Sequence, residues 1–126
     1  MLANLFKSEI YARIYRNRMA LRLIRKNRNL EAIAEQPFTS HRLLVGDFTS
    51  AEKLLSWMVK KIVGSSWLPM MPSILIHPVE MVEGGLSQVE ERLFQELGLG
   101  ARGGKVKVYV GPELSDQAVI DKLAGR

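Results

Sequence analysis

The stretch SILIHPVEMVEGGLSQVEERLFQELGLGARGGKVKVYV, residues 73–110, has the pattern of a strand, a helix and a second strand. Its first part, SILIH (residues 73–77), is a short apolar run followed by proline, which predicts a buried strand. Residues 87–90 read Ser-Gln-Val-Glu, a capping box that satisfies free N–H groups where a helix begins. Residues 106–110 are the second apolar run. Two strands joined through a helix indicate a parallel pair with a right-handed crossover.

The neighbouring segments extend this unit in both directions. Upstream, Thr49 and Glu52 have capping-box spacing, and Gly64 is a plausible helix end. Between them, apolar residues recur at helical spacing: Leu54, Leu55, Met58, Val59 and Ile62. Downstream, Ser115 is expected to cap a last short helix. The back half of the chain therefore predicts the order helix, strand, helix, strand, helix.

The front half, residues 10–34, fits two structures. One is a long basic amphipathic helix with an apolar stripe of four residues: Ile10, Ile14, Leu21 and Ile24. The other is a meander of three strands, with alternating apolar residues over 10–14 and 19–23 and a third strand over 30–34. Periodicity alone slightly favours the helix, and both structures remain open at this point.

Composition bounds the class of protein. The chain has 126 residues, of which 47% are hydrophobic and 25% charged, as expected for one folded domain. Residues 1–8 are expected to be an amphipathic or flexible segment, and residues 9–126 the domain. The absence of cysteine excludes disulfides, thiolate zinc sites, cysteine nucleophiles and iron–sulfur clusters. No apolar run approaches the ~18 residues of a membrane span, so we expect a cytoplasmic protein.

The positive charge is concentrated near the N-terminus. The net charge is +5, and the first 48 residues hold nine Lys or Arg and four Asp or Glu, so the whole excess lies there. Its centre is a basic stripe of seven residues: Arg13, Arg16, Arg18, Arg22, Arg25, Lys26 and Arg28. Such a stripe is typical of contact with an anionic membrane, nucleic acid or an acidic partner, and also of a solvated surface.

Three segments resemble the bacterial actin family of the rod-shape-determining protein MreB. GDFTSAEKLLSWMVKKI (residues 46–62) resembles its "ADF…TEKML" helix, and PSILIHPV (residues 72–79) its "PRVLVCVP" strand. SQVEERLFQELGLGA (residues 87–101) resembles its "TQVERRAIRESA…GA" helix. More loosely, NLEAIAEQPF (residues 29–38) is similar to the family's third strand, "GIVLNEPS". The resemblance covers most of this chain but less than half of the family's chain.

The resemblance implies a fold. It predicts a ribonuclease H-like α/β subdomain in the order βββαβαβα, with a five-stranded mixed sheet and helices packed on it. For the front half it implies a short amphipathic anchor followed by a β-hairpin. It also implies links to the cytoskeleton and to cell shape.

The family's nucleotide motif is missing from the matching positions. Actin-like ATPases have a phosphate loop of the type Asp-Leu-Gly-Thr between their first two strands, where glycine lets backbone N–H groups reach phosphate. Residues 12–17 here read Ala-Arg-Ile-Tyr-Arg-Asn, without glycine or aspartate, and the second phosphate loop would lie beyond Arg126. We therefore expect no nucleotide hydrolysis, no enzyme activity, no catalytic residues, no cofactor and no small-molecule substrate.

The two histidines do not have the spacing of a metal site. His41 and His77 are 36 residues apart, whereas metal-binding pairs usually have a short spacing such as i,i+4. We expect structural positions for both histidines and no bound metal.

The leading functional hypothesis is a non-enzymatic, actin-related adaptor or assembly module. Its partner would be a protein, either an actin-like filament protein or a second copy of the chain. MLANLFKSEI (residues 1–10) resembles the segment with which MreB proteins touch the inner membrane. Leu2, Leu5 and Phe6 would insert, while Lys7 and the basic stripe would meet lipid headgroups.

Four large side chains around the linker after the first predicted helix form a candidate partner patch: Trp57, Trp67, Met70 and Met71. Ordinary core packing is the other interpretation of these residues. The alternative function is a basic nucleic-acid-binding module with a ribonuclease H-like fold, in which Tyr11 and Tyr15 would stack on bases between the arginines.

Overall fold

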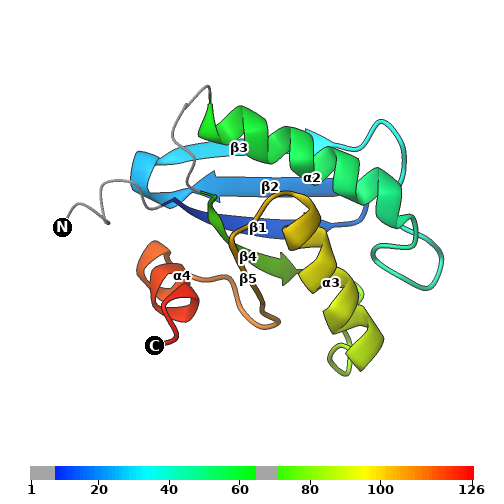
Figure 1. Ribbon diagram of the computed structural model, residues 1–126. Coiled ribbons are helices and arrows are strands. Elements are labelled where there is room, and N and C mark those ends of the chain that lie inside the picture. The colour runs from blue at the N-terminus through cyan, green and yellow to red at the C-terminus, as the bar shows by residue number, and fades with distance from the viewer. Residues whose placement is uncertain (1–7, 65–70) are drawn as a thin grey trace.

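One five-stranded mixed sheet organises the protein (Figure 1). The computed structural model describes residues 8–64 and 71–126. The strands are β1 (Glu9–Tyr15), β2 (Arg18–Leu23), β3 (Arg28–Ile33), β4 (Ser73–Pro78) and β5 (Lys105–Val108). Their spatial order is β3-β2-β1-β4-β5, with β2 antiparallel to both of its neighbours and β4 parallel to both of its own. The predicted α/β class with five strands is confirmed.

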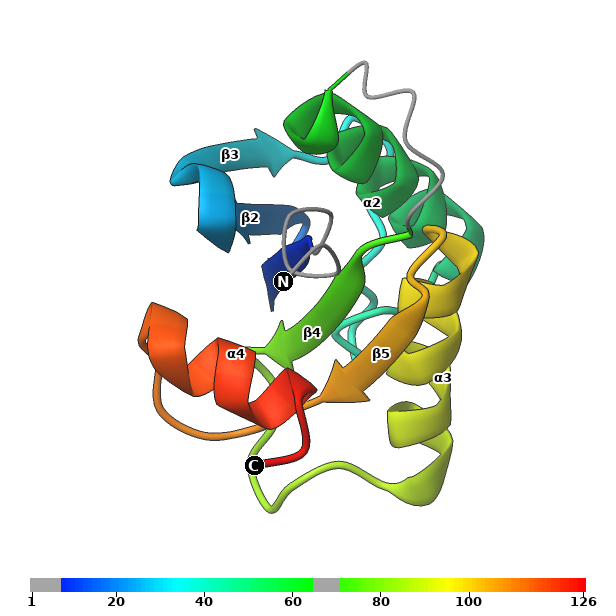
Figure 2. The ribbon, with the colours of Figure 1, turned by 60° about the vertical axis from the view of Figure 1, so that its left-hand side comes forward.

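Helices cover the two faces of the sheet unequally. The helices of the described residues are α2 (Phe48–Val63), α3 (Gln88–Gly100) and α4 (Asp116–Leu123), with a short 3-10 helix, η1 (Ile24–Lys26), between β2 and β3. Figure 2 shows α2 and α3 on one face and α4 on the other. The element order is the one that the resemblance implied, βββαβαβα, apart from the inserted η1.

The front half of the chain is a β-hairpin, so the long-helix interpretation is wrong. β1 and β2 pair in register, with Ile14 opposite Met19 and Tyr15 opposite Arg18, which leaves a two-residue turn. Asn17 in that turn has a φ of 51°, and its side-chain oxygen accepts the N–H groups of Phe38 and Thr39 at 2.8 Å each. In both strands, every second side chain points into the larger core. Most of the apolar residues that fit a helical stripe belong to this alternating set, so their helical spacing carried no structural information.

Several boundaries differ from the predictions. The third strand was predicted over residues 30–34 and runs over Arg28–Ile33, because η1 and Asn27, with a φ of 51°, complete the turn earlier. The last strand was predicted over residues 106–110 and runs over Lys105–Val108. Each strand lies within two residues of its prediction at both ends.

Two of the three predicted helix N-caps are confirmed. Ser87 and Glu90 form the reciprocal capping box of α3, with N–H to side-chain oxygen distances of 3.1 and 3.2 Å, and Ser115 caps α4. The predicted box at Thr49 is wrong. The N-cap of α2 is Asp47, whose carboxylate accepts the N–H of Ser50 at 3.1 Å and its hydroxyl at 2.7 Å. These bonds to Ser50 lower the pKa of Asp47.

The core has two parts. The larger lies between the sheet and helices α2 and α3, and the smaller lies beneath α4, around Tyr11, Leu75 and Val119. In the larger part, fully buried side chains come from three strands and two helices: Ile10, Ile14, Met19, Leu55, Met58, Ile76 and Leu97. In β1 and β4, neighbouring residues alternate between the two parts, so these two strands connect both faces.

Candidate interaction surface

The basic stripe of the sequence is not a single surface in the structure. Register and alternation place Arg13, Arg18 and Arg22 on the face that carries α4. Arg16 lies in the β1–β2 turn, Arg25 and Lys26 belong to η1, and Arg28 begins β3. The seven side chains therefore leave the sheet in different directions.

Acidic partners from distant parts of the chain engage most of these arginines. Five ion pairs join stripe residues to carboxylates: Arg13–Glu113, Arg16–Glu80, Arg18–Glu31, Arg22–Asp116 and Arg25–Glu9. Arg22 binds both carboxylate oxygens of Asp116 at 2.7 and 2.8 Å, which lowers the pKa of Asp116. Arg28 instead donates to the carbonyl oxygen of Ile62 at 3.0 Å. The charge that a lipid or nucleic acid would meet is thus smaller than the sequence indicates.

An internal carboxylate occupies the turn where the resemblance places a phosphate loop. The backbone N–H of Arg16 donates to one oxygen of Glu80 at 2.7 Å, and its guanidinium donates to the other at 2.9 Å. Backbone N–H groups and a guanidinium are also what a phosphate would require. In this turn, both the N–H and the guanidinium of Arg16 already donate hydrogen bonds to Glu80.

Some predicted contact residues lie outside the described residues. The proposed lipid contacts Leu2, Leu5, Phe6 and Lys7 belong to this group, as do Trp67 and Met70 of the partner patch. Within residues 8–64 and 71–126, no helix combines the length and the apolar character needed to cross a membrane.

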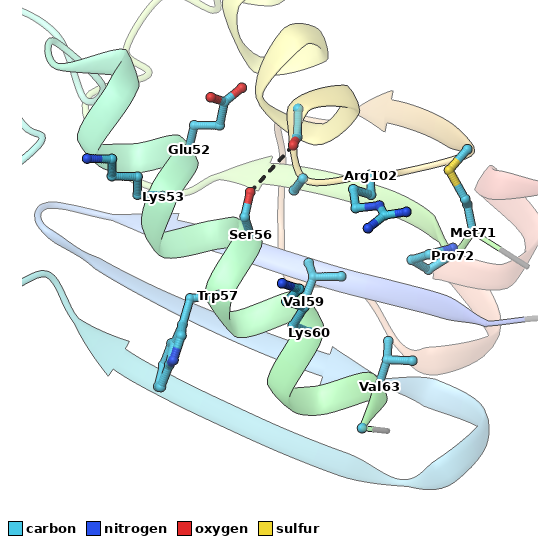
Figure 3. A pocket seen from close by; sticks show the side chains of 13 residues that line it. Glu52, Lys53, Ser56, Trp57, Val59, Lys60, Val63, Met71, Pro72 and Arg102 are labelled. Atoms are coloured by element: carbon cyan, nitrogen blue, oxygen red, sulfur yellow. Dashed lines mark hydrogen bonds between the residues drawn. The ribbon is translucent and has the colours of Figure 1, made fainter. Parts of the chain in front are cut away.

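Trp57 and Met71 are exposed beside a pocket between α2 and the end of α3. Their exposed fractions are 51% and 54%. This α2–α3 pocket has a volume of about 680 Å³, and Figure 3 shows its lining side chains. Ser56 of α2 donates to the carbonyl oxygen of Gly100 at 3.4 Å across it. The two described members of the predicted patch thus lie on one surface.

Trp57 also borders a second depression, the α2–β3 groove. This groove has a volume of about 460 Å³ and lies between α2 and the end of β3. Its walls include three smaller apolar side chains in addition to Trp57: Ala32, Ala34 and Leu54. This groove was not predicted from the sequence, because Leu54 was counted only among the apolar residues of a helix and Ala34 only as the end of a strand.

The rim of these two depressions is mainly basic. Lys53, Lys60 and Arg102 line the α2–α3 pocket, and Lys61 holds its ammonium 5.5 Å from the centre of the Trp57 ring. The acids that line the two depressions are Glu52 and Glu35. An apolar centre with a basic rim is complementary to a segment that carries both apolar and acidic side chains.

His77 is part of a buried structural network on the other face of the sheet. Its side chain is 2% exposed; Nε2 donates to the carbonyl oxygen of Gly111 at 2.9 Å, and Nδ1 accepts the hydroxyl of Tyr11 at 2.7 Å. The N–H of Leu114 donates to the same hydroxyl at 3.1 Å. Burial lowers the pKa of His77 and raises the pKa of Tyr11. The predicted structural position of His77 is confirmed.

No cluster of three or more His, Asp or Glu side chains suited to a metal ion occurs in the part of the chain that the structure describes. His41 is exposed in the loop between β3 and α2. Each buried side-chain nitrogen or oxygen among the described residues has a hydrogen-bond partner.

Comparison with known proteins places the chain in a family. No protein-family model matches it. The uncharacterized protein YjaA of Escherichia coli (strain K12) is 35% identical over 125 residues, which cover 92% of this chain and 97% of YjaA. At this identity and coverage, the chain belongs to the same family as YjaA.

Proposed function

We propose that this protein is a non-enzymatic protein-binding module with a ribonuclease H-like layout, related to one subdomain of MreB-type actins. The strand order β3-β2-β1-β4-β5, with β2 alone running against the others, supports the layout. The capture of Glu80 by the β1–β2 turn supports the absence of nucleotide chemistry, since that turn is where the resemblance places a phosphate loop.

The observation that carries the proposal is the exposure of Trp57 between two depressions with a basic rim. A half-exposed tryptophan leaves a large apolar surface in water, and tryptophan is enriched among residues that dominate binding energy at protein interfaces. Lys53, Lys60, Lys61 and Arg102 would steer an acidic partner to it. The partner is therefore a protein segment with apolar anchors and acidic neighbours.

The resemblance supplies the wider setting of the proposal. It supports a cytoplasmic assembly module that binds an actin-like filament protein at the inner membrane surface and contributes to cell shape. Direct lipid contact would depend on Leu2, Leu5 and Phe6, because the ion pairs engage much of the basic stripe. Co-sedimentation with anionic liposomes should weaken for Leu5→Asp, and equal recovery of both proteins would contradict the lipid contact.

The nucleic-acid alternative has one specific observation in its favour. The guanidinium of Arg18 lies 3.9 Å from the centre of the Tyr15 ring, on the face of the sheet that carries α4. The same guanidinium pairs with Glu31, however, so a phosphate would have to displace that carboxylate. Nucleic-acid binding predicts a band shift with single-stranded DNA at low salt, and the absence of that shift would exclude this alternative.

A display library of random twelve-residue linear peptides tests the protein-binding proposal. The wild-type protein should retain peptides that combine aromatic or aliphatic residues with Asp and Glu. Trp57→Ala should retain them at least about tenfold more weakly, since tryptophan truncation at an interface commonly costs more than 1.4 kcal/mol. Val89→Ala removes another exposed apolar side chain, 76% exposed on α3, and should leave binding unchanged.

A charge variant of the same surface provides a second arm. The double variant Lys53→Glu, Lys60→Glu should bind the retained peptides more weakly than the wild-type protein does. The difference should grow as ionic strength falls, because the rim would then repel acidic residues. Retention of peptides by Trp57→Ala at wild-type strength, or retention of none by the wild-type protein, would contradict the proposal.

A further inference from the structure

The two edge strands of the sheet are protected to different degrees. β5 has only four residues, carries Lys105 and Lys107, and receives a side-chain hydrogen bond from Gln95 Nε2 to the carbonyl oxygen of Val106 at 3.1 Å. Short length, lysine and a covering side chain are the features with which proteins block strand addition. This edge is closed to another chain.

β3, the opposite edge, lacks these features as far as residues 8–64 and 71–126 are concerned. It is six residues long, RNLEAI, and contains neither lysine nor proline. Its two charged side chains are directed elsewhere, Arg28 to the carbonyl oxygen of Ile62 and Glu31 to Arg18. Ile33 at its end is 75% exposed. An unprotected edge of this length is a template for another strand.

The hydrogen bonds of β3 show which backbone groups point outward. The N–H of Ala34 donates to the carbonyl oxygen of Asn17 at 2.8 Å, so it points toward the β1–β2 turn. Backbone groups alternate in direction along an antiparallel strand. The N–H and carbonyl groups of Asn29, Glu31 and Ile33 therefore point away from β2, toward the open edge.

The α2–β3 groove lies where the side chains of an added strand would go. Ala32 and Ala34, which alternate with Ile33, form its floor beside β3, and Trp57 and Leu54 form its wall on α2. An added strand would place every second side chain in this groove and the intervening ones beside Ile33 on the other face. Main-chain bonds would supply affinity, and the groove would supply selectivity.

We propose that β3 accepts an extended segment of a partner protein as a sixth strand, with alternate apolar side chains under Trp57 and acidic side chains near Lys53. This inference rests on the proposed protein-binding function and specifies the conformation of the partner. Charge argues for a partner rather than a second copy. In a symmetric antiparallel pair centred on Glu31, the two Glu31 carboxylates would face each other, and the lysines of both α2 helices would be brought together.

The test uses proline at an outward-pointing position. Ile33→Pro removes an N–H that β2 does not use, which an edge strand tolerates. Ile33→Thr is the matched control, because it keeps the N–H and the preference for a strand. Peptides retained by the wild-type protein from the random twelve-residue library should bind Ile33→Pro at least about tenfold more weakly than they bind Ile33→Thr.

A second arm leaves the protein unchanged. The same peptides, N-methylated at every second residue, should lose binding in one of the two methylation phases and keep it in the other, because only one set of N–H groups faces β3. This arm decides the question even if Ile33→Pro fails to fold.

The outcomes separate the two proposals. If the wild-type protein retains no peptide, both proposals are overturned. If Trp57→Ala weakens binding but Ile33→Pro and both N-methylated phases do not, strand addition is overturned and the protein-binding function stands. A concentration-dependent dimer of the wild-type protein that Ile33→Pro abolishes would assign the edge to a second copy and overturn the partner segment.

Discussion

The two faces of the sheet are packed against their helices by different kinds of interaction. The face beneath α2 and α3 is a continuous apolar layer that draws fully buried side chains from β1, β2 and β4. The face beneath α4 has a small apolar cluster, the buried Tyr11–His77 pair and ion pairs such as Arg22–Asp116. One face therefore supplies most of the stability, while the other fixes the position of a short helix through polar contacts.

Ile76 and Leu75 provide the sharpest test of this difference. They are adjacent in β4, both are fully buried, and they point to opposite faces. Ile76→Ala should lower the free energy of unfolding by about 4 kcal/mol, and Leu75→Ala by about 2–3 kcal/mol, because the smaller cluster under an eight-residue helix can collapse into the cavity more easily. Urea unfolding measures both values. A larger loss for Leu75→Ala would contradict the comparison.

Removing the polar network around His77 should lower the free energy of unfolding by an intermediate amount. His77→Phe keeps an aromatic ring between Tyr11 and Tyr109 but deprives the Tyr11 hydroxyl and the Gly111 carbonyl of their partner. We expect a loss of about 2 kcal/mol, the usual cost of leaving buried polar groups without hydrogen bonds. An unchanged urea midpoint would show that the network contributes nothing to the α4 face.

The same histidine predicts a pH dependence. Burial lowers the pKa of His77 in the folded state below the value of about 6.5 that it has when unfolded, so the unfolded chain binds a proton first. The contribution of neutral His77 to the free energy of unfolding is then fully present above about pH 6.5. It falls as the pH drops from there toward the pKa of His77 in the folded state. The urea midpoint of the wild-type protein should decrease between pH 7.5 and 5.5. His77→Phe should remove that decrease, and an equal decrease in both proteins would contradict its assignment to His77.

The smallest effect is expected at the surface of the α4 face. Arg22→Met breaks the bidentate pair with Asp116, and partial exposure of both groups limits the loss to below about 1 kcal/mol at neutral pH. Because Arg22 lowers the pKa of Asp116, the contribution is present above the ordinary aspartate pKa and is lost as the pH falls below it. Arg92→Met, on the exposed side of α3, is the control. A loss above 2 kcal/mol would mean that ion pairs dominate this face.

The apolar pattern predicted the element order of the back half of the chain and failed in the front half, where two periods coincide. The unit from Ser73 to Val108 and the capping box at Ser87 could be predicted because apolar runs, helix spacing and capping agree there. Between Ile10 and Ile24, the same residues fit both a helix and strands, and pairing with β4 decides for strands. Asp47 was missed as a cap because Thr49 offered a competing box two residues later.

The candidate surface was predictable only in part. Trp57 and Met71 could be chosen because large apolar side chains stood near a predicted helix end. The α2–β3 groove could not be predicted, since its floor is made of small residues and its position depends on which strand forms the edge. The acidic partners of the stripe, such as Glu80 and Asp116, lie 64 and 94 residues away from their arginines, where a local charge pattern carries no information.

The most direct test of the account is a map of backbone amide shifts when a library-retained peptide is added to the ¹⁵N-labelled protein. Partner binding at the α2 side and the β3 edge predicts that the largest shifts occur at Glu31, Ile33 and Trp57, with the amides of α4 and β5 unchanged. Shifts concentrated on α4 and around Arg13 and Arg22, with Ile33 and Trp57 unaffected, would contradict it.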